Sequence, residues 1–369
     1  MNLFGGIYKG KKVLITGNTG FKGSWLSIWL LELGAEVYGI SDKIISKPSN
    51  FVASKLEEKI NHFYCDITNF DKINAIITEV KPDFIFHLAA QAIVKDSYSN
   101  PLNAFSINTL GSATILEVLR INNIDCNVIM ITSDKCYENK EWMWGYRETD
   151  QIGGKDPYSA SKGAAEIIIK SYCDSFFCDE SSKTKVAIGR AGNVIGGGDW
   201  APYRIIPDAI KSWNLSEDLL IRYPNATRPW QHVLEPLSGY LLLGQKLYLN
   251  KNLCGEAFNF GPKSDANFSV IELLESIKKN FTMLSWRIIY SEVKLKEAGL
   301  LKLNCDKSLH MLGWNSILNF EQTVRFVSNW YEKYYSKANF DMYQISLNDI
   351  NEFIDLGIKQ NVEWSQNKT

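Results

Sequence analysis

The chain has 369 residues, 45% of them hydrophobic, and exceeds the roughly 250–300 residues at which single cores stop growing, so we expect two lobes. Its 40 basic and 41 acidic residues give a net charge of −1, which excludes a general field for nucleic acid or an anionic membrane. Seven cysteines without a Cys-x-x-Cys pair, and no signal-like or membrane-length apolar run, favour a cytoplasmic protein with reduced thiols and no metal.

Short β-rich apolar runs alternate with helical segments over the first half of the chain. The predicted strands are residues 13–16, 36–40, 62–65, 84–88, 127–131 and 186–190. The predicted helices are residues 21–33, 71–80, 103–120 and a segment starting near 157. This alternation is typical of an α/β fold with a Rossmann-like, doubly wound parallel sheet. Residues 191–369 are richer in Pro, Trp and Gly and should form mainly a smaller, interleaved lobe, with part of 231–260 returning to the sheet.

Three glycines follow the first predicted strand and open the first predicted helix, in the order Gly17-Asn18-Thr19-Gly20-Phe21-Lys22-Gly23. Without Cβ atoms there, backbone N–H groups can approach a pyrophosphate at the helix N-terminus. Asp42 lies 19 residues beyond Gly23, near the distance expected for a carboxylate on an adenosine ribose. No arginine stands beside Asp42, so we expect NAD rather than its 2′-phosphorylated form, bound by a domain of residues 1–190.

Tyr158 and Lys162 are four residues apart on a predicted helix, so both side chains project from one face. A free tyrosine has a pKa of about 10, and a nearby ammonium and an oxidised nicotinamide would both favour its phenolate. Ser133 follows a predicted strand, where open α/β sheets bind ligands, and its hydroxyl can bond the same alcohol oxygen. Asp134 and Lys135 come next. In a loop they would be solvated charges, but beside a catalytic serine an acid and an amine can remove water.

Two polar residues near predicted strand ends have simpler interpretations. Asp66 either accepts from an adenine amino group or is a solvated strand-end aspartate. His87 ends the fourth strand, and we expect it to make structural hydrogen bonds rather than to act in catalysis.

Ordered motifs over nearly the whole chain resemble those of the extended short-chain dehydrogenase/reductases, and within them the sugar-nucleotide 4,6-dehydratases. They occupy residues 16–25, 132–139, 144–148, 156–162, 190–200, 228–233 and 312–314. The relatives that act on TDP-glucose and GDP-mannose usually carry Asp-Glu after the serine or threonine, whereas this chain has Asp134-Lys135, as the CDP-glucose branch does. Residues 202–203 and 303–306 depart from the family pattern and leave the fine specificity for sugar and nucleotide open.

The resemblance implies a reaction of CDP-D-glucose that begins bacterial CDP-linked dideoxysugar and O-antigen lipopolysaccharide synthesis. Hydride leaves C4 to NAD with Tyr158 as base, Lys135 takes the C5 proton, Asp134 protonates the departing C6 hydroxyl, and the hydride returns to C6. The implied catalytic residues are Ser133, Asp134, Lys135, Tyr158 and Lys162. The implied cofactor-binding residues are Gly17, Thr19, Gly20, Phe21, Lys22, Gly23, Asp42, Asp66, Ile67, Leu88, Ala89, Ala90, Asn108, Tyr158 and Lys162. The implied substrate-binding residues are Gln91, Asn193, Arg204, Arg228 and His232.

Two questions stay open at this point. The alternative function is a 4,6-dehydratase or 4-epimerase for another nucleotide-linked hexose or heptose, although an epimerase has no use for Asp134 and Lys135. The predicted helices at 103–120 and 156–177 are apolar enough to pair across a two-fold axis, so we expect a homodimer or homotetramer.

Overall fold

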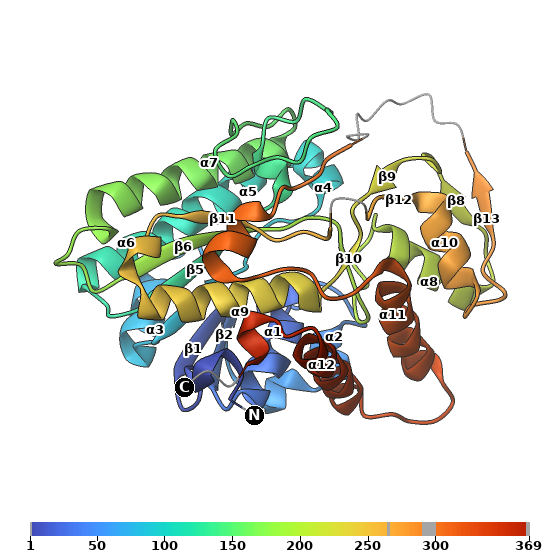
Figure 1. Cartoon of the computed structure of the whole chain (residues 1–369), viewed down its shortest axis with the longest axis horizontal. Coiled ribbons are helices and arrows are strands. Elements are labelled where there is room, and N and C mark those ends of the chain that lie inside the picture. The colour runs from blue at the N-terminus through green and yellow to red at the C-terminus, as the bar shows by residue number, and fades with distance from the viewer. Residues whose placement is uncertain (1, 264–265, 290–299, 367–369) are drawn as a thin grey trace.

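The computed structural model describes residues 2–263, 266–289 and 300–366. The larger of its two parts is built around a seven-stranded parallel sheet (Figure 1). Its strands, in spatial order, are β11 (Ala257–Asn259), β6 (Lys185–Arg190), β5 (Asn127–Ile131), β4 (Phe84–His87), β1 (Lys12–Thr16), β2 (Glu36–Ser41) and β3 (Asn61–Tyr64). Chain order reverses between β1 and β4, and open sheets bind ligands at such a switch point. The predicted Rossmann-like fold is confirmed.

The central strands are buried on both faces, as expected for a parallel sheet that helices cover on each side. Every residue of β4 and β5 is buried. In the register of the sheet, Thr16 of β1 pairs with His87 of β4, which in turn pairs with Met130 of β5. The carboxyl ends of these three strands are therefore level, and the loops that follow them open on one edge.

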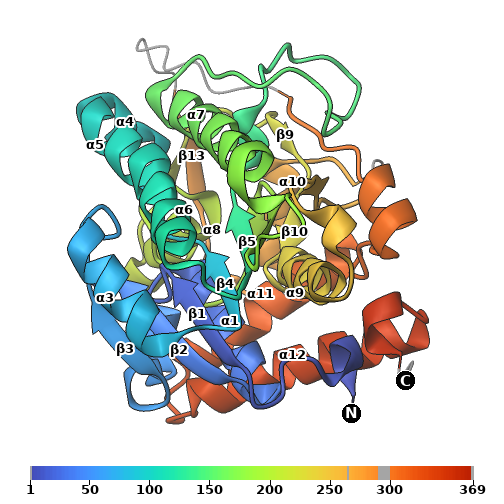
Figure 2. The ribbon, with the colours of Figure 1, turned by 90° about the vertical axis from the view of Figure 1, so that its left-hand side faces the viewer.

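Helices cover the two faces of the sheet, as Figure 2 shows in end view. One face carries α3 (Phe70–Val80), α6 (Gly111–Asn122) and α7 (Pro157–Tyr172). The other carries α1 (Phe21–Glu32) and α9 (Leu234–Leu249), with α12 (Met342–Lys359) packed against α1. Three shorter helices are α2 (Asn50–Ala53), α4 (Val94–Ser99) and α5 (Pro101–Phe105).

The predicted helix at residues 103–120 is interrupted in the structure. It consists of α5, a π-helical turn over Ser106–Leu110, and α6. The turn contains Asn108, whose side chain bonds to the backbone of Gln91 and to the Ser161 hydroxyl. The wider π-helical turn therefore places the Asn108 side-chain amide against α7.

The smaller lobe is built from helices and pairs of very short strands. Its helices are α8 (Ile205–Leu215), α10 (Val270–Lys278) and α11 (Phe320–Tyr335). The strand pairs are β7 (Val194–Ile195) with β10 (Gln231–His232), β9 (Thr227–Arg228) with β12 (Phe268–Ser269), and β8 (Leu219–Ile221) with β13 (Trp286–Ile288). Strands of two or three residues are too short to show the alternation that predicts a strand.

The chain passes between the two parts more than once. After β10 it runs through α9 and β11 along the sheet, and after α11 it returns through α12 to α1. The division near residue 190 stays a prediction. No helix within the described part of the chain is long and apolar enough to span a membrane.

Candidate active site

A cavity of about 1210 Å³ lies along the carboxyl ends of the central strands and reaches the smaller lobe. This volume exceeds the roughly 300–1,000 Å³ of sites for single small ligands, which suits two ligands side by side. Most of the predicted site residues line it: Gly17, Thr19, Gly20, Phe21, Lys22, Gly23, Asp42, Asp66, Ile67, Leu88, Ala89, Ala90, Gln91, Ser133, Asp134, Lys135, Tyr158, Lys162, Asn193, Arg204 and Arg228.

The glycine loop is packed too tightly for side chains. Gly17 has a φ of +75°, and a Cβ on it would lie 2.8 Å from the backbone of Ala89. A Cβ on Gly23 would lie 2.2 Å from the carbonyl oxygen of Gly17. The N-terminus of α1 therefore opens directly on the cavity, with backbone donors that a phosphate group can reach.

Two carboxylates stand at strand ends along the same side. Asp42 directly follows β2, and its half-exposed side chain lies 3.6 Å from the Lys43 amine. Asp66 follows β3, but its Oδ1 already accepts hydrogen bonds from the backbone N–H and the hydroxyl of Thr68. Asp42 is thus the carboxylate better placed for a ribose hydroxyl, while Asp66 makes a local turn.

Tyr158 and Lys162 lie in the first two turns of α7, which begins where Asp156 accepts a hydrogen bond from the backbone N–H of Ser159 at 3.0 Å. Both side chains are buried and line the cavity. Burial raises the pKa of Tyr158 to about 12, while a hydrogen bond with Ser133 opposes the rise. Burial also lowers the pKa of Lys162 to about 8, against the charge of Glu166.

The segment after β5 holds three polar side chains in fixed places. The Ser133 hydroxyl donates to Asp134 Oδ1 at 2.9 Å and accepts from the Lys135 backbone N–H at 3.2 Å, which caps a short 3-10 turn over Asp134–Cys136. A Cβ on Gly192 would lie 1.9 Å from Asp134 Oδ2, so only glycine leaves room for this carboxylate. Lys135 is half-buried and lines the cavity.

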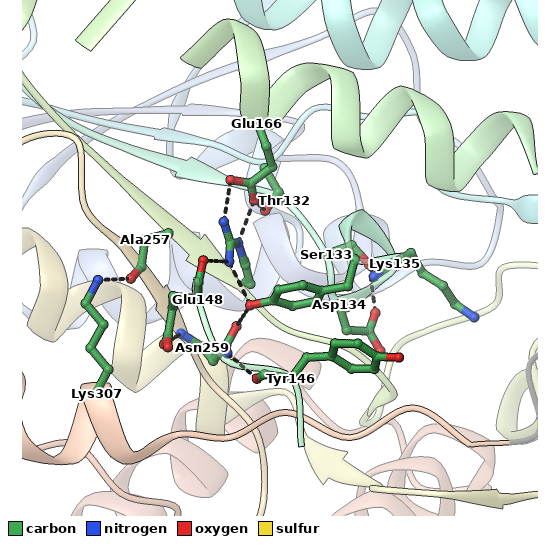
Figure 3. Close-up of polar contacts among 12 residues, drawn as sticks. Thr132, Ser133, Asp134, Lys135, Tyr146, Glu148, Glu166, Ala257, Asn259 and Lys307 are labelled. Carbon is green, nitrogen blue, oxygen red and sulfur yellow. Dashed lines mark hydrogen bonds and ion pairs between the residues drawn. The ribbon is translucent and has the colours of Figure 1, made fainter. Parts of the chain in front are cut away.

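A buried polar network supports this segment from behind (Figure 3). Glu166 of α7 forms a two-pronged ion pair with Arg190 of β6, both bonds being 2.9 Å, and accepts from the Thr132 hydroxyl. Arg190 also donates to the Tyr137 hydroxyl at 2.7 Å, and that hydroxyl donates to Asn259 of β11 at 2.8 Å. The residues on either side of Ser133–Lys135 are thus tied to three elements of the sheet domain.

Sequence reasoning missed this support. Glu166 is four residues beyond Lys162 and shares the helix face of Tyr158, so a signal was present in the spacing. Arg190 and Asn259 lie on strands that are only adjacent in space, and no local pattern connects them.

The Lys22 side chain makes contacts that the glycine motif does not predict. Its amine donates to the Tyr240 hydroxyl of α9 at 3.2 Å. Burial lowers the pKa of Lys22 to about 7, and the charges of Arg204 and Lys162 add to this effect while Asp134 opposes it. Lys22 also lines the cavity, so its amine is electrostatically coupled to three other residues of the candidate site.

The smaller lobe contributes cationic and amide groups to the opposite wall. Arg204, just before α8, forms an ion pair of 2.7 Å with the buried Asp199. Arg228 of β9 and Asn193, in the left-handed conformation with a φ of +52°, face the same cavity. These groups suit the phosphate oxygens of a nucleotide sugar.

Two predicted ligand contacts lie elsewhere. His232 is completely buried with its ring packed between Trp25 and Phe326, and it does not line the cavity, so its placement in the substrate site is corrected. Asn108 is also buried and does not line the cavity; it bonds to the backbone of Gln91, and its contact with a cofactor stays a prediction.

His87 was expected to be structural, and this is confirmed. It bonds to the Thr16 and Ser112 hydroxyls at 2.8 and 3.2 Å, and burial lowers its pKa to about 3.

Known proteins share this fold. A CDP-glucose 4,6-dehydratase from Salmonella typhimurium is 42% identical over 88% of this chain and 91% of its own length. Among solved structures, a dTDP-glucose 4,6-dehydratase from Bacillus anthracis in complex with NAD has a TM-score of 0.72 at 19% identity, covering 88% of this chain and 97% of that one. A UDP-glucose 4-epimerase from Thermotoga maritima has a TM-score of 0.75 at 20% identity, covering 88% and 100%.

The family model described as GDP-mannose 4,6 dehydratase matches residues 14–327. This range includes the glycine loop, the segment after β5, the Tyr-Lys helix and most of the smaller lobe. The chain belongs to this nucleotide-sugar 4,6-dehydratase family of the extended short-chain dehydrogenase/reductases.

Proposed function

We propose that this chain catalyses the NAD-dependent dehydration of CDP-D-glucose to CDP-4-keto-6-deoxy-D-glucose. One observation carries the proposal: Ser133, Asp134 and Lys135 face a cavity that Tyr158 and Lys162 line from the neighbouring helix. A base for alcohol oxidation thus stands beside an acid and an amine that can eliminate water. The Salmonella relative, 42% identical, is named for the same reaction.

The glycine loop fits NAD by its shape. Cβ atoms on Gly17 or Gly23 would collide with backbone, so only glycines let the loop fold this tightly at the start of α1, where a diphosphate would bind. Asp42 stands at the end of β2 without an arginine beside it, which favours a free ribose 2′-hydroxyl. When bound, NAD would accept a hydride from C4 and return it to C6, and its ring charge would favour ionisation of Tyr158.

Tyr158 is the base for the C4 hydroxyl in this proposal. Burial raises its pKa to about 12 against the opposing hydrogen bond with Ser133, so the buried tyrosine stays protonated until further positive charge arrives. Ser133, which bonds to Tyr158, would hold the C4 oxygen in place for proton transfer. Lys162, one helical turn further along α7, contributes its charge from the same face.

Asp134 and Lys135 carry out the elimination. Once C4 is a ketone, the C5 proton is acidic, and the Lys135 amine removes it while Asp134 protonates the C6 hydroxyl as it leaves. Asp134 is confined between Ser133 and Gly192, whereas Lys135 extends away from the polar network on a flexible stem (Figure 3). A fixed acid and a movable base suit a leaving group and a proton on adjacent carbons.

Arg204 and Arg228 would hold the diphosphate of the substrate. A guanidinium fork matches two phosphate oxygens, and the ion pair of Arg204 with Asp199 fixes its direction. Asn193 adds an amide beside them. The cytidine contacts stay a prediction, because residues 202–203 and 303–306 differ from the usual family pattern.

The direct experiment incubates the purified protein with CDP-, TDP- and UDP-glucose and follows formation of a 4-keto product. We expect CDP-glucose to be converted faster than TDP- or UDP-glucose. When the reaction runs in D₂O, the product should carry deuterium at C5. A C4-epimerised sugar with its C6 hydroxyl intact would instead support a 4-epimerase and contradict the role of Asp134 and Lys135.

We also propose that the protein forms a homodimer through α5, α6 and α7. Large apolar side chains on these helices, and on the π-helical turn between α5 and α6, are exposed, which is unusual for a free surface. They are Leu102, Leu110, Ile121 and Ile167. Light scattering at several concentrations tests this: Ile167→Glu should lower the molar mass, and a parent protein that is monomeric throughout contradicts the proposal. A cytoplasmic location also stays a prediction.

A further inference from the structure

Three cysteines meet at the end of α7, outside the active-site cavity. Cys173 begins a π-helical turn over Cys173–Phe177, Cys178 follows that turn, and Cys254 ends a short 3-10 helix over Lys251–Leu253. Their sulfur atoms all lie within 4.8 Å of one another. None of the three lines the cavity, so the family reaction does not account for them.

Backbone contacts hold the three thiols in place. The N–H of Cys178 donates to the Cys173 carbonyl at 2.9 Å, which brings two residues five positions apart onto one side of the turn. The Lys251 amine donates to the carbonyl oxygens of Asp179, Glu180 and Ser182, at 2.6, 3.0 and 3.0 Å. The segment after Cys178 is therefore clamped to the helix that carries Cys254.

Gly255 provides the space for the sulfurs. Its φ is +81°, and its N–H donates to the Val186 carbonyl of β6 at 2.8 Å. A Cβ there would lie 3.2 Å from the Cys178 sulfur and 3.4 Å from the Cys173 Cβ. The cluster thus rests on the edge of the sheet, with Cys173 buried, Cys254 half-buried and Cys178 exposed.

The separation of the sulfurs is close to what a tetrahedral metal requires. With zinc–sulfur bonds of about 2.3 Å, ligand sulfurs stand about 3.8 Å apart, so a contraction of about 1 Å or less completes the site. Cys178 can supply this movement because its side chain is exposed. No fourth protein ligand joins the cluster within residues 2–263, 266–289 and 300–366, which leaves one position for water.

The surroundings also balance the charge. Three thiolates and one Zn²⁺ carry a net charge of −1. The Lys170 amine lies 3.5 Å from the position of a Cβ on Gly255, but it is paired with the Asp174 carboxylate at 2.7 Å. Lys251, which acts electrostatically on Cys254, therefore supplies the net positive charge that offsets the anionic site.

We propose that Cys173, Cys178 and Cys254 form a zinc site with three thiolate ligands and one solvent position. Binding releases the thiol protons to solvent and requires no oxidant. Soft thiolate ligands select zinc over the hard divalent cations of the cell. The ion would join the end of α7, whose first turns carry Tyr158 and Lys162, to the edge of the sheet.

The test uses the full chain, reduced with a phosphine and stripped with EDTA. We expect one equivalent of Zn²⁺ to bind, with a higher Tm, and Co²⁺ in its place to give the visible absorption bands of a tetrahedral thiolate complex. Cys254→Ser should weaken zinc binding at least about 100-fold, since even outer contacts of metal ligands are worth about 10–100-fold. The matched control is Cys305→Ser, a half-buried cysteine outside the cluster, which should bind zinc like the parent protein.

Cys178→Ser removes the exposed ligand and serves if Cys254→Ser does not fold. The proposal is overturned if the reduced chain takes up no stoichiometric zinc, if the ligand variants bind it as the parent does, or if bound Co²⁺ shows octahedral bands. A disulfide between two of these cysteines in air, with no zinc uptake after reduction, would also overturn it and assign the cluster to thiol oxidation.

Discussion

The two walls of the cavity are constructed differently. The sheet wall is made by segments that directly follow β1, β2, β4 and β5, together with the first turns of α7. The opposite wall comes from loops and very short strands, including Asn193, Arg204 and Arg228, and Arg204 is held there by Asp199, five residues earlier in the chain. In the proposed mechanism, the groups that act on the sugar lie on the sheet wall, and the groups that would hold its diphosphate lie opposite.

The largest expected effect is on the sheet wall. Tyr158→Phe keeps the ring and its packing but removes the ionisable hydroxyl, so turnover should fall by about 10²–10⁴-fold or more while NAD stays bound. Activity with CDP-glucose and cofactor content after gel filtration are the measurements. Tyr172→Phe, on the same helix but bonded to Glu117, is the control and should leave activity unchanged. Near-parental turnover of Tyr158→Phe would remove the redox role of this wall.

The buried Glu166–Arg190 ion pair behind the sheet wall should contribute to the free energy of unfolding. Glu166→Gln leaves the buried Arg190 charge unpaired and should lower the free energy of unfolding by about 3–5 kcal/mol. Glu117→Gln breaks an exposed ion pair with Arg120 on α6 and should cost only about 0–1 kcal/mol. Urea denaturation compares the two, and equal losses would show that the buried network does not stabilise the sheet wall.

Gly192 lies directly against Asp134 of the sheet wall, and its lack of a side chain leaves room for the Asp134 carboxylate. Gly192→Ala should push the Asp134 carboxylate from its place and slow dehydration by about 10²-fold, since a shift of about 1 Å can have that effect. In an Asp134→Asn background the same change should cost little more, because both act on one group. Additive losses in this double-mutant cycle would contradict the contact.

The smallest expected effect concerns Lys22, which lies in the first turn of α1 and lines the cavity. Its pKa is lowered to about 7 in the folded chain and is near 10.5 when unfolded, so folding releases a proton between these values and stability rises with pH. The cost of burying the charge is therefore greatest at and below pH 7. In Lys22→Met the gain in stability relative to the parent should shrink from pH 7 to pH 9, as followed by denaturation, and a constant difference would contradict the lowered pKa.

The difference between the two walls also explains which site residues can be predicted from the sequence. The glycine loop, the strand ends and the Tyr158–Lys162 spacing are local signals, and all of them meet at the cavity. His232 shows where local signals fail: it neighbours Arg228 in a substrate motif, yet its ring packs in the core because α1 and α11 pass on either side.

Sequence patterns also do not reveal which residues, far apart along the chain, come together in the fold. Glu166, Arg190 and Asn259 form one network only after β5, β6 and β11 pair. Cys254 likewise reaches Cys173 and Cys178 through the packing of one loop on β6, and its spacing along the chain gives no hint of this.

The role of Lys135 tests the account most directly, because oxidation and elimination separate there. Lys135→Met keeps the apolar stem and loses the amine, so CDP-glucose should still be oxidised at C4 but should not lose water. The measurement is the absorbance of reduced cofactor bound to the protein, together with the yield of 6-deoxy product. Lys140→Met, in the exposed loop nearby, is the matched control.

We expect reduced cofactor to accumulate in Lys135→Met with product formation slowed by about 10²–10⁴-fold, the usual contribution of a general base. The Lys140→Met control should behave like the parent. If Lys135→Met instead turns over like the parent protein, without accumulation of reduced cofactor, Lys135 is a solvated loop charge and the dehydratase proposal loses its main support.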